Sequence, residues 1–146
     1  MPKQLISLIG ILSLALSARP QVVLQLNAGS RASWGTNQDL FIDQQGHCRY
    51  YLNEVNGKKE DSSFFSVPAV QIDSLLTKAQ QLGFFGLNEK YDAGRADGAG
   101  IFISLSSSGK KHSVDLRNED LPAIHELVDR INRILAPHRI RINYGQ

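Results

Sequence analysis

In two stretches of this chain the apolar residues recur at the spacing of an α-helix. In the segments around them, apolar and polar residues alternate, which is typical of β-strands. The apolar face of the first stretch consists of Ile72, Leu75, Leu76, Ala79 and Leu82. The apolar face of the second consists of Leu121, Ile124, Leu127, Val128, Ile131, Ile134 and Leu135. Each pattern predicts an amphipathic helix. Such a helix must bury its apolar face against another layer, so we expect the strands to form a sheet beneath both helices.

Short signals mark the ends of these helices. Pro68 suits the first turn of the first helix, where no N–H is needed, and Ser66 is the expected N-terminal cap. Gly83 suits the position just after the last turn, where a positive φ is common. Asn118 or Asp120 is the expected cap of the second helix.

Alternating runs that are rich in β-branched and aromatic residues predict strands at 21–27, 39–43, 47–55, 58–65, 101–105 and 111–116. Asn56-Gly57 favours a tight hairpin turn, because both residues accept a positive φ. The tail at 139–142 alternates Ile with Arg, which indicates an edge strand with Arg toward solvent. The expected fold is therefore α+β: an antiparallel sheet of five to six strands (β-meander, helix, β-hairpin, helix), with both helices packed on one face.

The N-terminus has the layout of a secretory signal peptide. Lys3 supplies a positive charge, residues 5–16 are uncharged and mostly apolar, and Ala15, Ser17 and Ala18 supply small residues for cleavage. The run is shorter than the roughly 20 apolar residues of a spanning helix. We expect a signal peptide at 1–18 and a single domain at 19–146, secreted or periplasmic and without a stable membrane span after cleavage. The alternative is an uncleaved N-terminal anchor.

Charge and cysteine content exclude some classes of protein. The chain has 16 Lys and Arg residues against 14 Asp and Glu residues, and a net charge of +2 is too small for a nucleic-acid binder. Its single cysteine, Cys48, excludes an internal disulfide and a multi-cysteine zinc site. Because Cys48 lies in a strand-like run beside His47, we expect it to be buried, with His47 on the opposite face. We expect no cofactor and no metal, and a monomer.

Several motifs resemble those of a family of small bacterial exported α+β domains of unknown function. They are the hairpin with an Asp-x-x-Gly turn at 41–51, the Asn-Gly turn, the helix end Leu-Gly-Phe-Phe-x-Leu at 82–87, and Asp97-Gly98 before a Ser-rich hairpin. Many relatives carry a cysteine-containing segment before the first hairpin, but residues 33–37 here hold none. The resemblance implies a fold and export, and it implies no chemistry.

The glycine-rich segment at 91–100 holds candidate binding residues. Its backbone N–H groups and Arg95 could cradle an anion, and Asp92 and Asp97 could offer oxygens to Ca²⁺. The segment lacks the P-loop and EF-hand patterns, however, so a flexible connection is the preferred interpretation.

Trp34, with Arg31 nearby, is the other binding candidate. A Trp in a polar loop is either a binding hot spot or a cover for the sheet edge, and the second is favoured. The histidines at 47, 112, 125 and 138 show no metal-binding spacing, and no motif of a catalytic cysteine surrounds Cys48.

We therefore expect an exported domain that acts as a non-catalytic binding module. Its expected partner is another envelope or extracellular protein, a peptide or a surface polymer, and not nucleic acid. The expected binding surface is either the sheet face or the loops at Trp34 and at 94–100. The candidate binding residues are Trp34, Arg31, Asp92, Arg95 and Asp97. The alternative is a small hydrolase or inhibitor-type protein with a site assembled from scattered residues.

Overall fold

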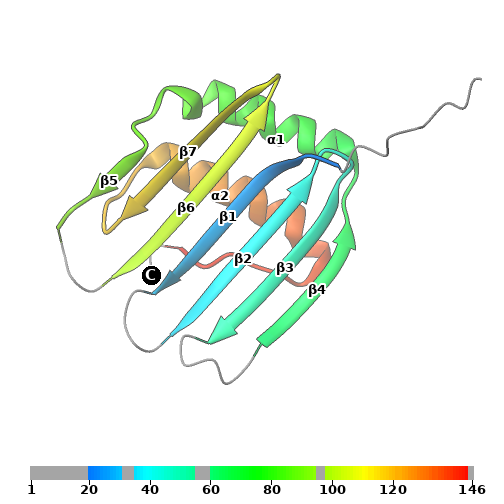
Figure 1. The fold of residues 1–146 in the computed structure, drawn as a ribbon, viewed down its shortest axis with the longest axis horizontal. Coiled ribbons are helices and arrows are strands. Elements are labelled where there is room, and N and C mark those ends of the chain that lie inside the picture. Colours follow the sequence, from blue (N-terminus) through cyan, green and yellow to red (C-terminus); the bar gives the residue numbers. More distant parts are fainter. Residues whose placement is uncertain (1–19, 31–34, 55–59, 95–97, 145–146) are drawn as a thin grey trace, which may run out of the picture.

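A computed structural model describes residues 20–30, 35–54, 60–94 and 98–144 of the chain. They form two layers, a seven-stranded sheet and, behind it, two helices that both lie on one face (Figure 1). The strands are β1 (Val22–Ser30), β2 (Thr36–Asp43), β3 (His47–Glu54), β4 (Glu60–Ser66), β5 (Lys90–Asp92), β6 (Ala99–Ser107) and β7 (Lys110–Arg117). The helices are α1 (Ala69–Gln81) and α2 (Pro122–Leu135), with short 3₁₀ turns at Phe84–Gly86 and Ala136–His138.

The strands lie in the order β4-β3-β2-β1-β6-β7-β5. The meander β1–β4 forms one half of the sheet and the hairpin β6–β7 most of the other half. The two halves meet where β1 pairs with β6, which brings Leu24 opposite Leu105. The α+β class and the two helices are thus confirmed, while the sheet has seven strands instead of five or six.

The core lies between the sheet and the helices. Every second residue of the central strands points toward the helices and is buried, as in Leu24, Leu26, Leu40, Ile42, Ile101, Ile103, Leu105, Val114 and Leu116. The helices supply Ile72, Leu75, Ala79, Ile124, Leu127, Val128, Ile131, Ile134 and Leu135. The apolar residues that recur every second position in the strands therefore pack against those that recur every 3.6 positions in the helices, and together they form one apolar layer.

The helix ends differ from expectation at their N-termini. The residues before α1 and α2 are Pro68 and Leu121, and neither helix has a side-chain cap. Ser66 is instead the last residue of β4, where it pairs with His47. Gly83 follows α1 with a φ of 72°, which confirms the positive φ expected there.

Two strand predictions were wrong. The short strand β5 was not expected, and it pairs with β7 in parallel, so the sheet is not wholly antiparallel. The tail at 139–142 joins no strand of the sheet. Its alternation was correct, since Ile140 and Ile142 are buried while Arg139 and Arg141 are exposed, but these isoleucines belong to the core.

Two side-chain amides hold this tail. Gln38, buried on β2, donates from Nε2 to the carbonyl of Arg141 at 2.7 Å and accepts at Oε1 from the N–H of Asn143 at 2.8 Å. Asn132 of α2 donates to the carbonyl of Ile142 at 3.1 Å and accepts from its N–H at 2.7 Å. The tail thus makes strand-like hydrogen bonds with side chains instead of with another strand.

No helix in the described ranges is long and apolar enough to cross a membrane. The segment at 1–18 and the Asn56-Gly57 turn lie outside the described residues.

Candidate functional site

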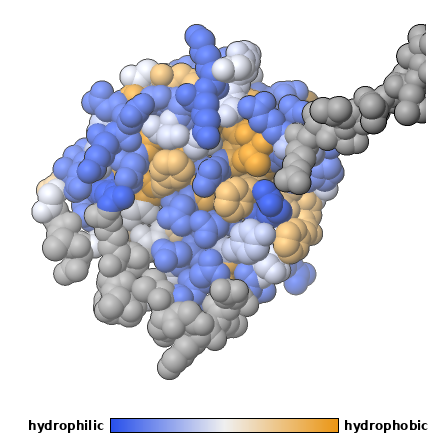
Figure 2. All heavy atoms as spheres, viewed as in Figure 1, coloured by the Kyte–Doolittle hydropathy of each residue, from blue (hydrophilic) through white to orange (hydrophobic). Residues whose placement is uncertain are grey.

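The sheet face that points away from the helices carries no helix or strand of the described residues (Figure 1). We call it the open face. Figure 2 shows it as mainly hydrophilic, with separate hydrophobic patches over the strands. Its side chains come from the alternate strand positions that do not face the core. The strand register that aligns the core residues therefore also determines which side chains are neighbours on the open face.

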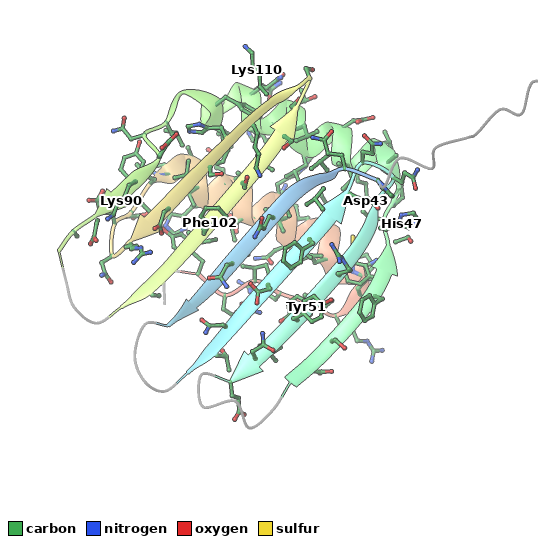
Figure 3. The ribbon with its side chains drawn as sticks, viewed as in Figure 1. Asp43, His47, Tyr51, Lys90, Phe102 and Lys110 are labelled. Atoms are coloured by element: carbon green, nitrogen blue, oxygen red, sulfur yellow. The ribbon has the colours of Figure 1, made fainter. Side chains whose placement is uncertain are left out.

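Three rows of residues cross the open face at right angles to the strands. The central row consists of Asp115, Phe102, Asn27, Asp39, Tyr51 and Ser62. On one side of it lies the glycine row, which consists of Arg117, Gly100, Gly29, Asn37 and Asn53. On its other side lies the outer row, which consists of Ser113, Ser104, Gln25, Phe41, Arg49 and Phe64. Phe102 and Tyr51 can be followed in Figure 3.

Aromatic rings gather where the central and outer rows cross β2, β3 and β4. Tyr51 lies edge-on to Phe41, with ring centroids 6.3 Å apart, and to Phe64, with centroids 6.0 Å apart. The guanidinium of Arg49 lies 5.3 Å from the centroid of Phe41, in cation–π range. Phe64 is 66% exposed, and only Val70 on α1 is a comparably exposed large apolar residue in the described ranges. We call Phe41, Arg49, Tyr51 and Phe64 the aromatic cluster.

Polar side chains of the central and glycine rows hold one another in place. Asn27 donates from Nδ2 to Oδ1 of Asp39 at 2.8 Å. Asn53 donates from Nδ2 to Oδ2 of the same carboxylate at 3.4 Å. Both oxygens of Asp39 therefore accept hydrogen bonds from neutral amides, which restricts the orientation of the carboxylate.

A hollow of about 280 Å³ lies beside Phe102 at the β1–β6 junction. Its floor contains Gly29 and Gly100, which face each other across the two strands. A Cβ on Gly29 would lie 1.7 Å from Oδ1 of Asn37, so the Asn37 amide occupies the space a side chain would take. A Cβ on Gly100 would make only ordinary contacts, the nearest at 3.5 Å.

An ion pair forms one wall of this hollow. Nε of Arg117 donates to both oxygens of Asp115 at 2.9 Å, and Nη2 lies 2.8 Å from Oδ2. Both side chains remain partly exposed, at 29% and 27%. The two charges therefore neutralise each other while their outer edges still face solvent.

At the far end of the open face, Asp43 organises the β2–β3 turn. Its Oδ1 accepts from the backbone N–H groups of Gln45 at 2.9 Å and His47 at 3.0 Å, and its Oδ2 lies 2.9 Å from Nδ1 of His47. Although partial burial raises the pKa of Asp43, these hydrogen bonds and the charge of His47 outweigh it and hold the pKa below its ordinary value.

The Asp43–His47 pair, labelled in Figure 3, invites comparison with a hydrolase dyad, since the strand register places Ser66 of β4 opposite His47. Within the described residues, no hydrogen bond joins Ser66 to His47. The pair therefore closes a turn, and the described residues place no nucleophile in a hydrogen bond with His47.

Most of the candidate binding residues from the sequence lie outside the described residues, namely Trp34, Arg31, Arg95 and Asp97. Asp92 is described: it is exposed at the end of β5, and its Oδ1 accepts from the N–H of Gly94 at 3.0 Å. It closes a local turn and lies on a different part of the molecule from the aromatic cluster. Among the described residues, no three His, Cys, Asp or Glu side chains gather to hold a metal ion.

Cys48 is buried, as expected, and His47 is exposed on the opposite face. The Cys48 thiol is 2% exposed and lies 3.4 Å from the carbonyl oxygen of Gly46. Burial, with a smaller contribution from the charge of Asp43, raises the pKa of Cys48 to about 12. The thiol is therefore protonated near neutral pH and is a poor nucleophile.

The sequence contained part of the signal for the open face. Phe41 in β2 and Arg49 in β3 each lie between two buried residues, and Tyr51 is the next outward-facing residue of β3. Such positions on a solvated strand face are normally polar. Nothing in the sequence indicated that Gly29 of β1 lies beside Gly100 of β6, because the two strands are far apart in the chain.

The sequence matches no model of a known protein family, and no curated protein is detectably similar to it.

Proposed function

We propose that this chain is a non-catalytic binding module that recognises its ligand with the open face of the sheet. The observation that supports the proposal is the aromatic cluster. Three aromatic rings and an arginine lie in mutual contact on a surface that the core does not need. Aromatic residues and Arg are the residue types that contribute most to binding in protein interfaces.

The degree of exposure strengthens this argument. A Phe side chain on an edge strand gains little stability when it is 66% exposed, and it adds a risk of aggregation. Its edge-on contact with Tyr51 fixes the ring before any ligand arrives, so little conformational entropy is lost on binding. These features favour a preformed binding surface.

The proposal also includes export. The N-terminal layout at 1–18 and the resemblance to small bacterial exported domains both favour a secreted or periplasmic protein. The expected ligand is therefore a component of the cell envelope or the extracellular space.

Co-sedimentation with envelope material from the source cells tests the proposal. The purified domain should pellet with the envelope, and the variant Tyr51→Ser/Phe64→Ser should remain in the supernatant. The matched control is Val70→Ser, which removes a side chain that is 70% exposed on the helix layer.

Equal pelleting of the aromatic-cluster variant and the wild type would contradict the proposal, as would a wild type that stays in the supernatant. Circular dichroism of each variant checks that the fold is retained, since exposed substitutions of this kind usually change stability by less than about 0.5 kcal/mol.

A further inference from the structure

We infer that the ligand of the open face is an uncharged polysaccharide chain, and that one of its sugar rings sits in the hollow floored by Gly29 and Gly100. The inference rests on the proposed function and names the class of ligand. It is carried by the shape of the hollow, the ring of Phe102, the pairing of the charges and the length of the central row.

The hollow has the form of a subsite for one ring. It measures about 280 Å³; its floor is bare backbone at Gly100, and the Asn37 amide covers the backbone at Gly29. Asn27 and Asn37 line it with amides, which donate and accept hydrogen bonds at the same time. A sugar hydroxyl does the same, so an amide-lined hollow suits a ring that carries hydroxyls.

Phe102 supplies the apolar wall. It lies between Asp115 and Asn27 in the central row and lines the hollow. Figure 3 labels Phe102 on β6. One face of a sugar ring presents C–H groups with partial positive charge, and these pack well on the negative face of an aromatic ring. The hollow thus offers an aromatic surface for the C–H groups and amides for the hydroxyls.

The charges of the two rows favour an uncharged ligand. Asp115 is satisfied by Arg117, and Asp39 by the amides of Asn27 and Asn53. An anionic ligand would have to break the Asp115–Arg117 pair or leave its own charge without a partner, and a cationic ligand would compete with the two amides that already hold both oxygens of Asp39. A neutral ligand can hydrogen-bond to the outer edges of the same groups without disturbing them.

The length of the central row favours a chain over a single sugar. Phe102 lies on β6 and Tyr51 on β3, three strands apart along one register, which corresponds to roughly 14 Å. Between them lie Asn27 and Asp39, which are hydrogen-bonded to each other. Aromatic rings at both ends and polar groups between them fit several consecutive sugar rings laid across the strands.

A peptide is the less suitable occupant. Extended peptides that bind sheets usually do so at an edge, where free backbone groups supply hydrogen bonds. The hollow lies instead at the β1–β6 junction in the middle of the sheet, where the backbone groups of both strands are already paired.

Affinity electrophoresis in native gels tests the inference. The gels contain hydroxyethyl cellulose, mixed-linkage β-glucan, galactomannan or dextran as uncharged polymers, and heparin or chitosan as charged ones. We expect at least one uncharged polymer to retard the domain, with neither charged polymer retarding it more strongly. For that polymer, Gly100→Val and Phe102→Ala should each raise the dissociation constant on the order of tenfold.

The glycine variant has a matched control. Val at 100 projects into the hollow, and the nearest contact of its Cβ is an ordinary 3.5 Å. Gly86→Val adds the same side chain at a glycine with open space around it, in the 3₁₀ turn after α1, and should leave binding unchanged. A ¹H–¹⁵N spectrum of each variant verifies the fold.

Retardation by none of the uncharged polymers would overturn the inference, as would retardation that Gly100→Val and Phe102→Ala leave unchanged. Stronger retardation by heparin or chitosan would do the same. These failures are distinct from failure of the proposed function, which is tested on envelope material. Envelope that has been digested with proteinase should still bind the domain if the ligand is a polysaccharide. If digestion removes binding that depends on Phe64, the proposed function stands and the polysaccharide inference is wrong.

Discussion

Single side chains set local structure on the open face, and Asp43 is the clearest example. One carboxylate oxygen accepts two backbone N–H groups of the β2–β3 turn while the other contacts the ring of His47. These hydrogen bonds need the ionised carboxylate, because a protonated one is a weaker acceptor. Asp43 therefore links the stability of the first hairpin to pH.

We expect this link to appear at acid pH. The pKa of Asp43 is lower in the folded protein than the ordinary value of 3.8, so its contribution to stability is fully present above that value. The contribution is lost as pH falls through the lower pKa of the folded state. Urea unfolding from pH 7 to pH 2 should show wild type more stable than Asp43→Asn at neutral pH, with the gap closing in acid.

Asp73→Asn is the control, because it removes an exposed carboxylate from α1. If the gap between wild type and Asp43→Asn is independent of pH, the turn does not depend on the charge of Asp43.

Cys48 gives a second prediction at the same scale. Because its pKa is raised to about 12, the native protein should resist iodoacetamide at pH 8, and the thiol should react quickly in urea. Mass spectrometry of the alkylated protein measures both rates. Native labelling as fast as that of the unfolded chain would mean that the thiol is accessible.

Among the elements, the C-terminal tail depends most on a few contacts. Gln38 bonds to the backbone at Arg141 and Asn143, and its Nε2 also donates to the hydroxyl of Tyr50 at 2.8 Å. Removing the amide would leave buried or part-buried polar groups unpaired, which is more costly than losing a hydrogen bond in water.

Gln38→Met tests this role. We expect the free energy of unfolding to fall by about 1–3 kcal/mol, and the N–H of Asn143 to lose protection from hydrogen exchange. Gln80→Met, on the exposed side of α1, should change neither quantity. Retained protection of Asn143 in the Gln38 variant would show that Asn132 and the apolar contacts hold the tail without Gln38.

The tail also shows how far the sequence determines an element. The alternation of Ile with Arg correctly gave the buried and exposed sides, because burial follows from the period of two. The alternation could not identify the hydrogen-bonding partner of the tail, since Gln38 lies about a hundred positions earlier in the chain.

β5 was missed for a different reason: Lys90–Asp92 is three residues long and has no apolar alternation. Ser66 was misassigned because the same residue type suits a helix cap and a strand end.

The candidate site was less predictable than the fold. The sequence left the sheet face and the loops as alternative surfaces and named no residue of the sheet face. Most of the residues that it named, Trp34, Arg31, Arg95 and Asp97, lie outside the described residues. The open face depends on register across strands that are distant in the chain, such as Gly29 opposite Gly100. Apart from its aromatic residues, each residue of the face is typical of a solvated strand position, and only the pairing of the strands brings them together.

At the scale of the molecule, one face of the sheet forms the core and the other is proposed to bind the ligand. Substitutions on the two faces should therefore differ in their effect on stability. Leu26→Ala, at a side chain with no exposed surface, should destabilise the protein by about 2–5 kcal/mol. Phe64→Ala should change stability by less than about 0.5 kcal/mol. Thermal and urea unfolding measure both. A large loss of stability in the Phe64 variant would mean that the aromatic cluster serves the fold.

The junction between β1 and β6 also affects how the chain folds. The meander β1–β4 and the hairpin β6–β7 contain contacts between neighbours in sequence, and such contacts form early. The β1–β6 pairing joins Leu24 to Leu105 and must close a long loop, which is slower. In a chain exported N-terminus first, as proposed, β1 would wait with one edge unpaired until the second half had crossed the membrane. The central hydrogen-bonded seam would thus form late, and the glycine hollow that straddles it would exist only after β6 and β7 had crossed the membrane.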